Sequence, residues 1–212
     1  MRKLIIHPLF WIGLLLAILA LTSGMYMFNQ VKRHELKKRQ EFHGTLLSMP
    51  REIPPFNLEG MDNKPFNNRA LHGKWTIIFF GFTHCGYVCP TTMAKLAKTY
   101  HLLEAKKHYP LPHVVFISID PKRDTKARLS KYVKAFHPSF YAARGKDDQI
   151  KAMTQKMGIA YASVALKGQP NNYDIQHTGA IMLINPDGKL IAFFTAPHDS
   201  AKLARDYELV AW

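Results

Sequence analysis

The chain has 212 residues and a formal net charge of +14, from 29 Lys and Arg against 15 Asp and Glu. Its two cysteines exclude a four-cysteine zinc site or a four-thiolate iron–sulfur cluster. A basic surface is attracted to anionic lipid or to an acidic protein. Because no nucleic-acid-binding motif accompanies the charge, we expect no nucleic-acid partner.

The N-terminal segment is apolar. Residues 4–28 read LIIHPLFWIGLLLAILALTSGMYMF and contain no Lys, Arg, Asp or Glu. About 20 apolar residues cross a bilayer, so this segment predicts one transmembrane helix. A cleaved signal peptide is the alternative, but its apolar core is shorter and ends at a small-residue site. We therefore expect a retained anchor over residues 1–28, a basic juxtamembrane stalk over 29–49 and a globular domain over 50–212.

Basic residues lie on both sides of the apolar segment. Arg2 and Lys3 precede it, and five Lys or Arg residues follow it between positions 32 and 39. The positive-inside rule, taken alone, would place the C-terminal side in the cytoplasm. No Arg- and Ser-rich organellar presequence is present, which points to a bacterial membrane.

The remaining residues alternate between strand-like apolar runs and helical patterns. The expected elements, in chain order, are a hairpin at 52–68, a strand at 74–82, a helix from Pro90, a strand at 113–120, a helix from Asp124 to Phe136, a strand at 140–144, a helix to Met157, an extended segment at 161–166 with a polar turn after it, a hairpin of 180–185 with 189–195, and a helix at 199–209. This order predicts an α/β fold, with a mixed sheet flanked by helices on both faces. A thiol pair between the first central strand and the next helix is the thioredoxin-like arrangement.

The thiol pair lies in FFGFTHCGYVCP, where Cys85 and Cys89 are four positions apart. Buried cysteines can be core filler, and a disulfide that closes so short a loop stabilises little. The start of a helix favours thiolate, which is both a redox nucleophile and a soft metal ligand. Two thiolates and one further soft or borderline ligand suit trigonal Cu(I).

The residues alone leave the third ligand open. His84 adjoins Cys85, but neighbouring side chains in an extended loop point apart. His177 lies just before the last hairpin, and in a thioredoxin-like fold the loop at this place faces the cysteine loop. By position, His177 is explained equally well as a ligand and as an ordinary loop histidine. The polar stretch before it predicts a mobile loop that a bound metal would order.

Three motifs resemble those of the Sco/SenC family. The family's C-x-x-x-C-P matches at Cys85 and Cys89, its D-P-x-R-D-T at residues 120–125, and its Y-x-V-x-H-[ST] at residues 173–178, with Ile for Val. The three motifs stand in the family's order, and the similarity runs from about residue 53 to the C-terminal helix.

This resemblance implies a membrane-anchored, thioredoxin-like copper protein. It implies that Cys85, Cys89 and His177 bind one copper per domain, as Cu(I) or Cu(II), and that the two cysteines also form a redox-active disulfide. Asp120 and Asp124 are candidates to orient the site. For Asp124, a helix-capping role is the simplest interpretation.

Two departures from the family pattern remove negative charge beside the metal. Gly86 and Tyr87 occupy the cysteine loop, where the family often has an acidic residue, and Gln176 stands where the family often has Asp. Neither change removes a ligand, but both leave the preferred oxidation state of copper open.

The resemblance implies a metallochaperone rather than an enzyme, one that delivers copper to, or matures, the binuclear copper centre of cytochrome c oxidase. The implied partners are the copper-bearing oxidase subunit and a periplasmic thiol reductant. The implied location is the bacterial inner membrane, with the domain in the periplasm. The alternative is a thiol–disulfide oxidoreductase that reduces the target's cysteines without carrying metal and does not need His177. A peroxiredoxin-type peroxidase is disfavoured, because neither cysteine has Thr three residues before it.

Overall fold

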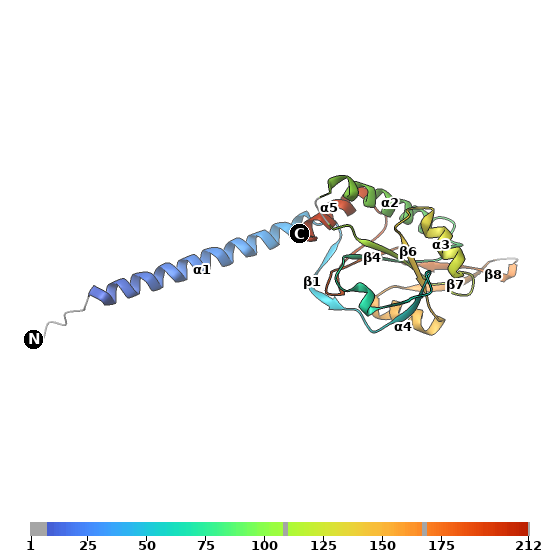
Figure 1. Ribbon diagram of the computed structural model, residues 1–212, viewed down its shortest axis with the longest axis horizontal. Helices are drawn as coiled ribbons and strands as arrows, with labels where there is room; N and C mark the ends of the chain where they lie inside the picture. The colour runs from blue at the N-terminus through green and yellow to red at the C-terminus, as the bar shows by residue number, and fades with distance from the viewer. Residues whose placement is uncertain (1–7, 108–109, 167–168, 212) are drawn as a thin grey trace, which may run out of the picture. The chain divides into compact units, whose positions relative to one another are not determined.

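The computed structural model describes residues 8–107, 110–166 and 169–211, and the chain divides into two compact units, Met1–Glu41 and Phe42–Trp212. The first unit contains the long helix α1 (Pro8–Glu41; Figure 1). Within it, Trp11–Arg33 is long and apolar enough to cross a membrane. The expected anchor is therefore helical, and the helix continues into the region expected to be a stalk.

The second unit is built on a mixed sheet. Among the described residues, eight strands follow the order β1-β10-β9-β4-β5-β6-β2-β3. The pairs β4–β5 and β5–β6 are parallel, and the other pairs are antiparallel. The strands are β1 (Thr45–Glu52), β2 (Asn57–Gly60), β3 (Pro65–Asn67), β4 (Thr76–Gly81), β5 (His113–Ser118), β6 (Tyr141–Arg144), β9 (Ile181–Ile184) and β10 (Lys189–Phe194).

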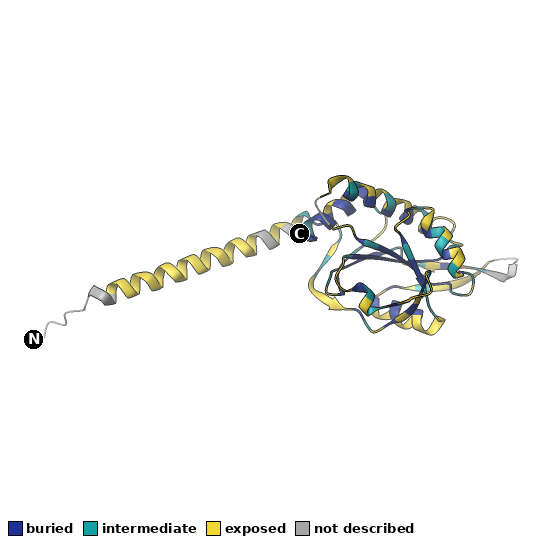
Figure 2. Ribbon diagram, in the orientation of Figure 1, coloured by how far each residue is buried: buried dark blue, intermediate teal, exposed yellow. Residues whose placement is uncertain are grey.

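Helices cover both faces of this sheet. Figure 1 places α2, α3 and α5 on one face and α4 on the other. These helices are α2 (Val88–Lys106), α3 (Lys126–Lys134), α4 (Asp147–Met157) and α5 (Ser200–Val210), and a short 3-10 helix, η1 (Asn68–Leu71), follows β3. A central strand covered on both faces is buried along its length and carries mostly apolar side chains. Accordingly, all six residues of β4 are buried (Figure 2).

The sequences of α2 and α4 explain which face of α2 is buried and where α4 ends. The apolar face expected on α2 is buried, at Met93, Leu96, Tyr100 and Leu103. Helix α4 ends where expected, at Gly158, which has a φ of +75°. This left-handed conformation costs glycine little, because glycine has no Cβ.

The start of the domain differs from the expectation. The boundary expected at residue 50 falls inside β1, which pairs antiparallel with β10. The fold begins at the buried Phe42, and the backbone N–H groups of His43 and Gly44 each donate to Asp206 Oδ2 at 2.8 Å. The sequence analysis missed this segment because its partners lie roughly 140 to 160 residues further along the chain.

A second, two-stranded sheet carries the chain toward the last hairpin. Strand β7 (Tyr161–Leu166) pairs antiparallel with β8 (Gln169–His177), so that Tyr161 lies opposite His177. The polar turn was expected at residues 167–172: positions 167 and 168 lie outside the described residues, and residues 169–172 belong to β8 instead. This pairing gives His177 a fixed place at the end of β8 rather than in a loop.

Candidate metal centre

The two thiols meet at the junction of β4 and α2. Cys85 lies half-buried in the loop, and Cys89 is buried in the first turn of the helix. Both are free thiols. The Cys89 backbone N–H donates to Cys85 Sγ at 3.4 Å. Cys85 Sγ therefore lies at the start of α2, where unpaired N–H groups stabilise negative charge.

His177 brings an imidazole to the same point. Its Nε2 lies 3.3 Å from Cys89 Sγ, although the two residues are 88 positions apart. Its Nδ1 lies 3.1 Å from the Thr178 carbonyl oxygen. Because a carbonyl only accepts, Nδ1 is the donor in this contact, and Nε2 is the ring nitrogen that faces the sulfur. The rings of Phe79 and Phe82, with centroids 6.0 and 5.9 Å from that of His177, hold the imidazole in place.

The structure thus brings together the three residues expected as copper ligands. The ligand atoms of Cys85, Cys89 and His177 all lie within 4.8 Å of one another. His84 is not part of this group. Its Nδ1 lies 3.4 Å from Thr83 Oγ1 and 3.8 Å from the Asp124 carboxylate.

The pair of cysteines shares one proton. The hydrogen bond from the Cys89 thiol lowers the pKa of Cys85 to about 3, and His177 and the N–H groups of Cys89 and Tyr87 act in the same direction. Conversely, the same hydrogen bond and burial raise the pKa of Cys89. Near neutral pH the site therefore holds one thiolate, at Cys85, and one thiol, at Cys89.

The Asp124 carboxylate holds the start of the cysteine loop in place by hydrogen bonds. Its side chain is fully buried and accepts from the Thr83 N–H at 3.1 Å, the Thr83 hydroxyl at 2.5 Å and the Ser118 hydroxyl at 2.7 Å. The expectation that Asp124 caps α3 is wrong. The adjacent Thr125 is the cap, and its side chain accepts from the Arg128 N–H. Asp and Thr can both cap a helix. The Asp124 carboxylate is buried and bonded to Thr83 and Ser118, so Thr125 is the residue that caps α3.

Asp120 connects the motif at 120–125 to the strand that carries His177. It forms an ion pair with Arg123 and accepts from the Tyr173 hydroxyl at 2.7 Å. The Arg123 guanidinium lies 3.8 Å from the Tyr173 ring centroid and donates to the Tyr173 carbonyl at 2.8 Å. Strand β8 is therefore fastened to the domain without a metal. The sequence reading missed Arg123 and Tyr173 as positioning residues, although their places in the two motifs were a signal.

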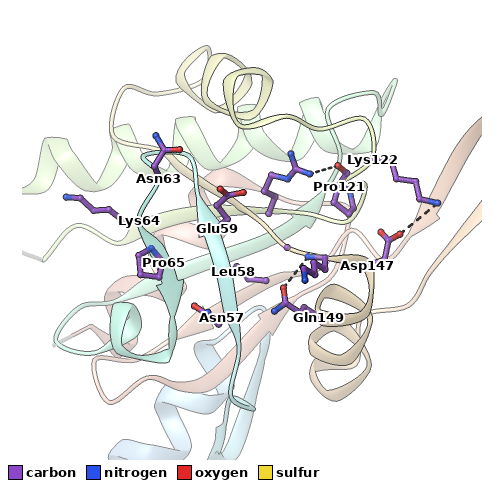
Figure 3. Close-up of a pocket in the computed structure, with 13 residues that line it drawn as sticks. Asn57, Leu58, Glu59, Asn63, Lys64, Pro65, Pro121, Lys122, Asp147 and Gln149 are labelled. Carbon is purple, nitrogen blue, oxygen red and sulfur yellow. Dashed lines mark hydrogen bonds and ion pairs between the residues drawn. The ribbon is translucent and has the colours of Figure 1, made fainter.

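The candidate metal centre lies apart from a cavity on another part of the domain. A cavity of about 610 Å³ lies between the β2–β3 hairpin, the loop after β5 and the start of α4 (Figure 3). Lys122 and Asp147 form an ion pair at its rim, 3.9 Å apart. Cys85, Cys89 and His177 do not line this cavity.

The fold and the site define a class of protein: a thioredoxin-like domain that presents two thiols and one imidazole at the start of a helix. The chain belongs to the SCO1/SenC family, whose sequence model matches residues 45–211. Among its relatives, the SCO2-like protein RP587 of Rickettsia prowazekii is 38% identical over 140 residues, which cover 66% of this chain and 67% of the relative.

Solved structures have the same fold. The crystal structure of Arabidopsis thaliana ScoI with copper bound gives a TM-score of 0.67 at 32% identity, over 71% of this chain and 92% of ScoI. A second structure is that of BsSco, a member of the Sco family of cytochrome c oxidase assembly proteins in which a disulfide switch was identified. It gives a TM-score of 0.61 at 19% identity, over 78% of this chain and 95% of BsSco. At that identity the likeness is one of fold alone.

Proposed function

We propose that Cys85, Cys89 and His177 bind one copper ion, and that the chain is a membrane-anchored copper metallochaperone for cytochrome c oxidase. The observation that carries the proposal is the approach of His177 Nε2 to within 3.3 Å of Cys89 Sγ. A disulfide reductase does not require an imidazole in that position, whereas a three-ligand copper site does. Membership of the SCO1/SenC family and the likeness to a copper-bound ScoI support copper as the metal.

The donor set favours Cu(I). Two thiolates and one imidazole are soft and borderline ligands, which select Cu(I) over harder ions. Binding needs both cysteines as thiolates, so the proton held by Cys89 leaves when the metal enters. Cys85 is already a thiolate and half-buried, so it offers an accessible first point of attachment.

The same residues suit transfer to an acceptor. Cys89 is buried, whereas Cys85 and His177 are only partly covered. An acceptor's ligands can reach the metal from the side of Cys85 and His177, while Cys89 holds it until the exchange is complete. The acceptor that we propose is the copper-bearing subunit of cytochrome c oxidase. The apolar helix at Trp11–Arg33 would keep the domain at the same membrane. We propose the bacterial inner membrane, with the domain in the periplasm, where a thiol reductant keeps both cysteines reduced.

Thiol–disulfide exchange is the second candidate, and the low pKa of Cys85 favours it. Cys85 thiolate would attack a target disulfide, Cys89 would then displace the target, and the products would be two target thiols and a Cys85–Cys89 disulfide. Attack depends on the thiolate, which this site supplies at neutral pH.

Metal analysis of ligand variants tests the copper proposal. The reduced protein should bind one Cu(I), Cys85→Ser or Cys89→Ser should abolish tight binding, and His177→Ala should weaken it at least about tenfold, or about 1.4 kcal/mol. The matched control is His84→Ala, which removes the imidazole next to Cys85 and should keep full affinity. Full copper binding by a cysteine variant would refute the ligand assignment. Unchanged affinity in His177→Ala, with intact reduction of a model disulfide, would favour the reductase.

A further inference from the structure

Strand β7 is an exposed and uncharged edge strand. Among the described residues it pairs with β8 alone, and the hairpin of the two strands extends away from the rest of the second unit (Figure 1). Its sequence is YASVAL, and five of its six residues are exposed. The side chains of Val164 and Leu166 are large and apolar, and these residues are 40% and 38% exposed. Such an edge is a template for pairing with another extended segment.

The two edges of the eight-stranded sheet differ from β7. Strand β1, at one edge, contains Pro50, Arg51 and Glu52. Strand β3, at the other edge, has three residues and begins with Pro65. Proline, charged side chains and short length all hinder the addition of a further strand to an edge. Strand β7 contains no proline and no charged residue, so it lacks this protection.

The hydrogen bonds of the hairpin identify which backbone groups of β7 are free. The Thr178 N–H donates to the Ala160 carbonyl at 2.9 Å, so this pair faces inward. Inward and outward pairs alternate along an antiparallel ladder, and the register is regular from Tyr161 to Ala165. The N–H and C=O groups of Tyr161, Ser163 and Ala165 therefore point away from β8. In the described part of the chain, these groups have no hydrogen-bond partner.

The outer edge of β8 is already engaged. The Tyr173 carbonyl accepts from Arg123, and the Ile175 N–H donates to the Asp174 side chain, both at 2.8 Å. Both backbone groups point away from β7, as the alternation along the ladder requires. A further strand can therefore add to the β7 side of the hairpin, whereas these contacts obstruct the β8 side.

Pairing at this edge would bring a partner to the proposed copper site. Tyr161 lies opposite His177, whose Nε2 is 3.3 Å from Cys89 Sγ. Neighbouring strands are about 4.8 Å apart, so a strand added to β7 would run about 10 Å from β8. The chain that continues from such a strand beyond Tyr161 would pass beside the metal ligands, on the side where Cys85 and His177 are only partly covered.

We propose that β7 is the docking edge for the copper acceptor, which adds an extended, apolar segment to it as a third strand. This inference rests on the proposed function in copper transfer. Backbone hydrogen bonds to Tyr161, Ser163 and Ala165 hold the segment, and the exposed Val164 and Leu166 favour apolar side chains in it. A second copy of the chain is a poorer occupant, because two chains of net charge +14 repel each other. The same charge favours an acceptor with an acidic surface.

Ser163→Pro tests the edge itself. The Ser163 N–H points outward, so proline removes one docking hydrogen bond and obstructs an added strand while it leaves the pairing with β8 intact. Ser163→Thr is the matched control, because threonine keeps the N–H and suits a strand. The full chain in detergent, loaded with one Cu(I), is mixed with the copper-free soluble domain of the oxidase's copper-bearing subunit. Ser163→Pro should slow copper transfer at least tenfold without a change in copper affinity or melting temperature, and Ser163→Thr should transfer like the unmodified protein.

Amide hydrogen exchange of the unmodified chain locates the docking edge directly. With the same acceptor domain bound, the N–H groups of Tyr161, Ser163 and Ala165 should exchange at least tenfold more slowly than in the free protein. Those of Ala162 and Val164 already face β8 and should change less. This measurement needs no variant, so it decides the matter even if Ser163→Pro does not fold. Equal exchange at the three outward groups with and without the acceptor domain would overturn the proposal.

The outcomes separate docking from copper binding. Equal transfer by Ser163→Pro and Ser163→Thr would overturn the docking proposal and leave the copper ligands unaffected. If the unmodified protein binds no copper, the proposed function fails, and the exchange measurement still decides whether the acceptor domain occupies β7. A dimer of this chain that Ser163→Pro dissociates would show that a second copy occupies the edge, and would overturn the acceptor as its occupant.

Discussion

Asp124→Ala should be among the most damaging single changes near the cysteine loop. The buried carboxylate accepts three hydrogen bonds, two from Thr83 and one from Ser118. A hydrogen bond to a charged group contributes about 1.5–3 kcal/mol, and the three bonds are not additive because they share one acceptor. Alanine would also leave the buried donors unpaired. We expect the free energy of unfolding to fall by about 3–5 kcal/mol.

Urea unfolding of a fragment that begins at Phe42, followed by far-UV circular dichroism, measures this loss. Asp148→Ala is the matched control: it removes an exposed carboxylate in the first turn of α4, which should cost at most about 1 kcal/mol. Under conditions in which Asp124→Ala remains folded, its copper affinity should fall at least about tenfold, because Thr83 no longer fixes the loop before Cys85. A loss of stability below about 1 kcal/mol, with unchanged copper affinity, would refute the anchoring role.

Three further predictions follow from the site. Arg123→Ala should speed amide hydrogen exchange at residues 173–177 and weaken copper binding about tenfold, or about 1.4 kcal/mol. The control Lys122→Ala should do neither, and equal exchange rates in the two variants would contradict the link between Arg123 and β8. The alkylation rate of Cys85 should stay nearly constant from pH 9 to about pH 5, and a rate that falls tenfold per pH unit below 8 would contradict the lowered pKa of about 3. Since that pKa lies below the usual 9.0, the thiolate's stabilising contribution is complete above pH 9 and is lost as the pH falls toward 3. Oxidation to a Cys85–Cys89 disulfide should block copper uptake, and undiminished uptake by the oxidised protein would show that the two thiolates are not the ligands.

Local patterns in the sequence predicted much of the fold. The continuous apolar run before the thiols is β4, and the helical spacing after them gives the buried face of α2. In β4 and α2 the pattern of apolar side chains within the segment itself is enough to identify the strand or the helix. Strand β1 was missed because its residues are mostly exposed and do not alternate between buried and exposed, so that only its pairing with β10, at the far end of the chain, defines it.

The site was predicted only in part, for the same reason. The cysteines were found from their spacing, but the position of His177 depends on how β7 and β8 bring it back to α2, which no local pattern specifies. The role of Arg123 depends on the same return of the chain to Tyr173. The sequence suggested a loop, whereas residues 169–177 form strand β8, and Arg123 donates to the Tyr173 carbonyl of that strand.

X-ray absorption spectroscopy of the reduced, copper-loaded protein tests the central proposal most directly. The account predicts one Cu(I) per chain, with two sulfur ligands and one nitrogen ligand, and loss of the nitrogen contribution in His177→Ala but not in His84→Ala. A copper site without sulfur ligands, or one whose nitrogen ligand survives in His177→Ala, would contradict the account.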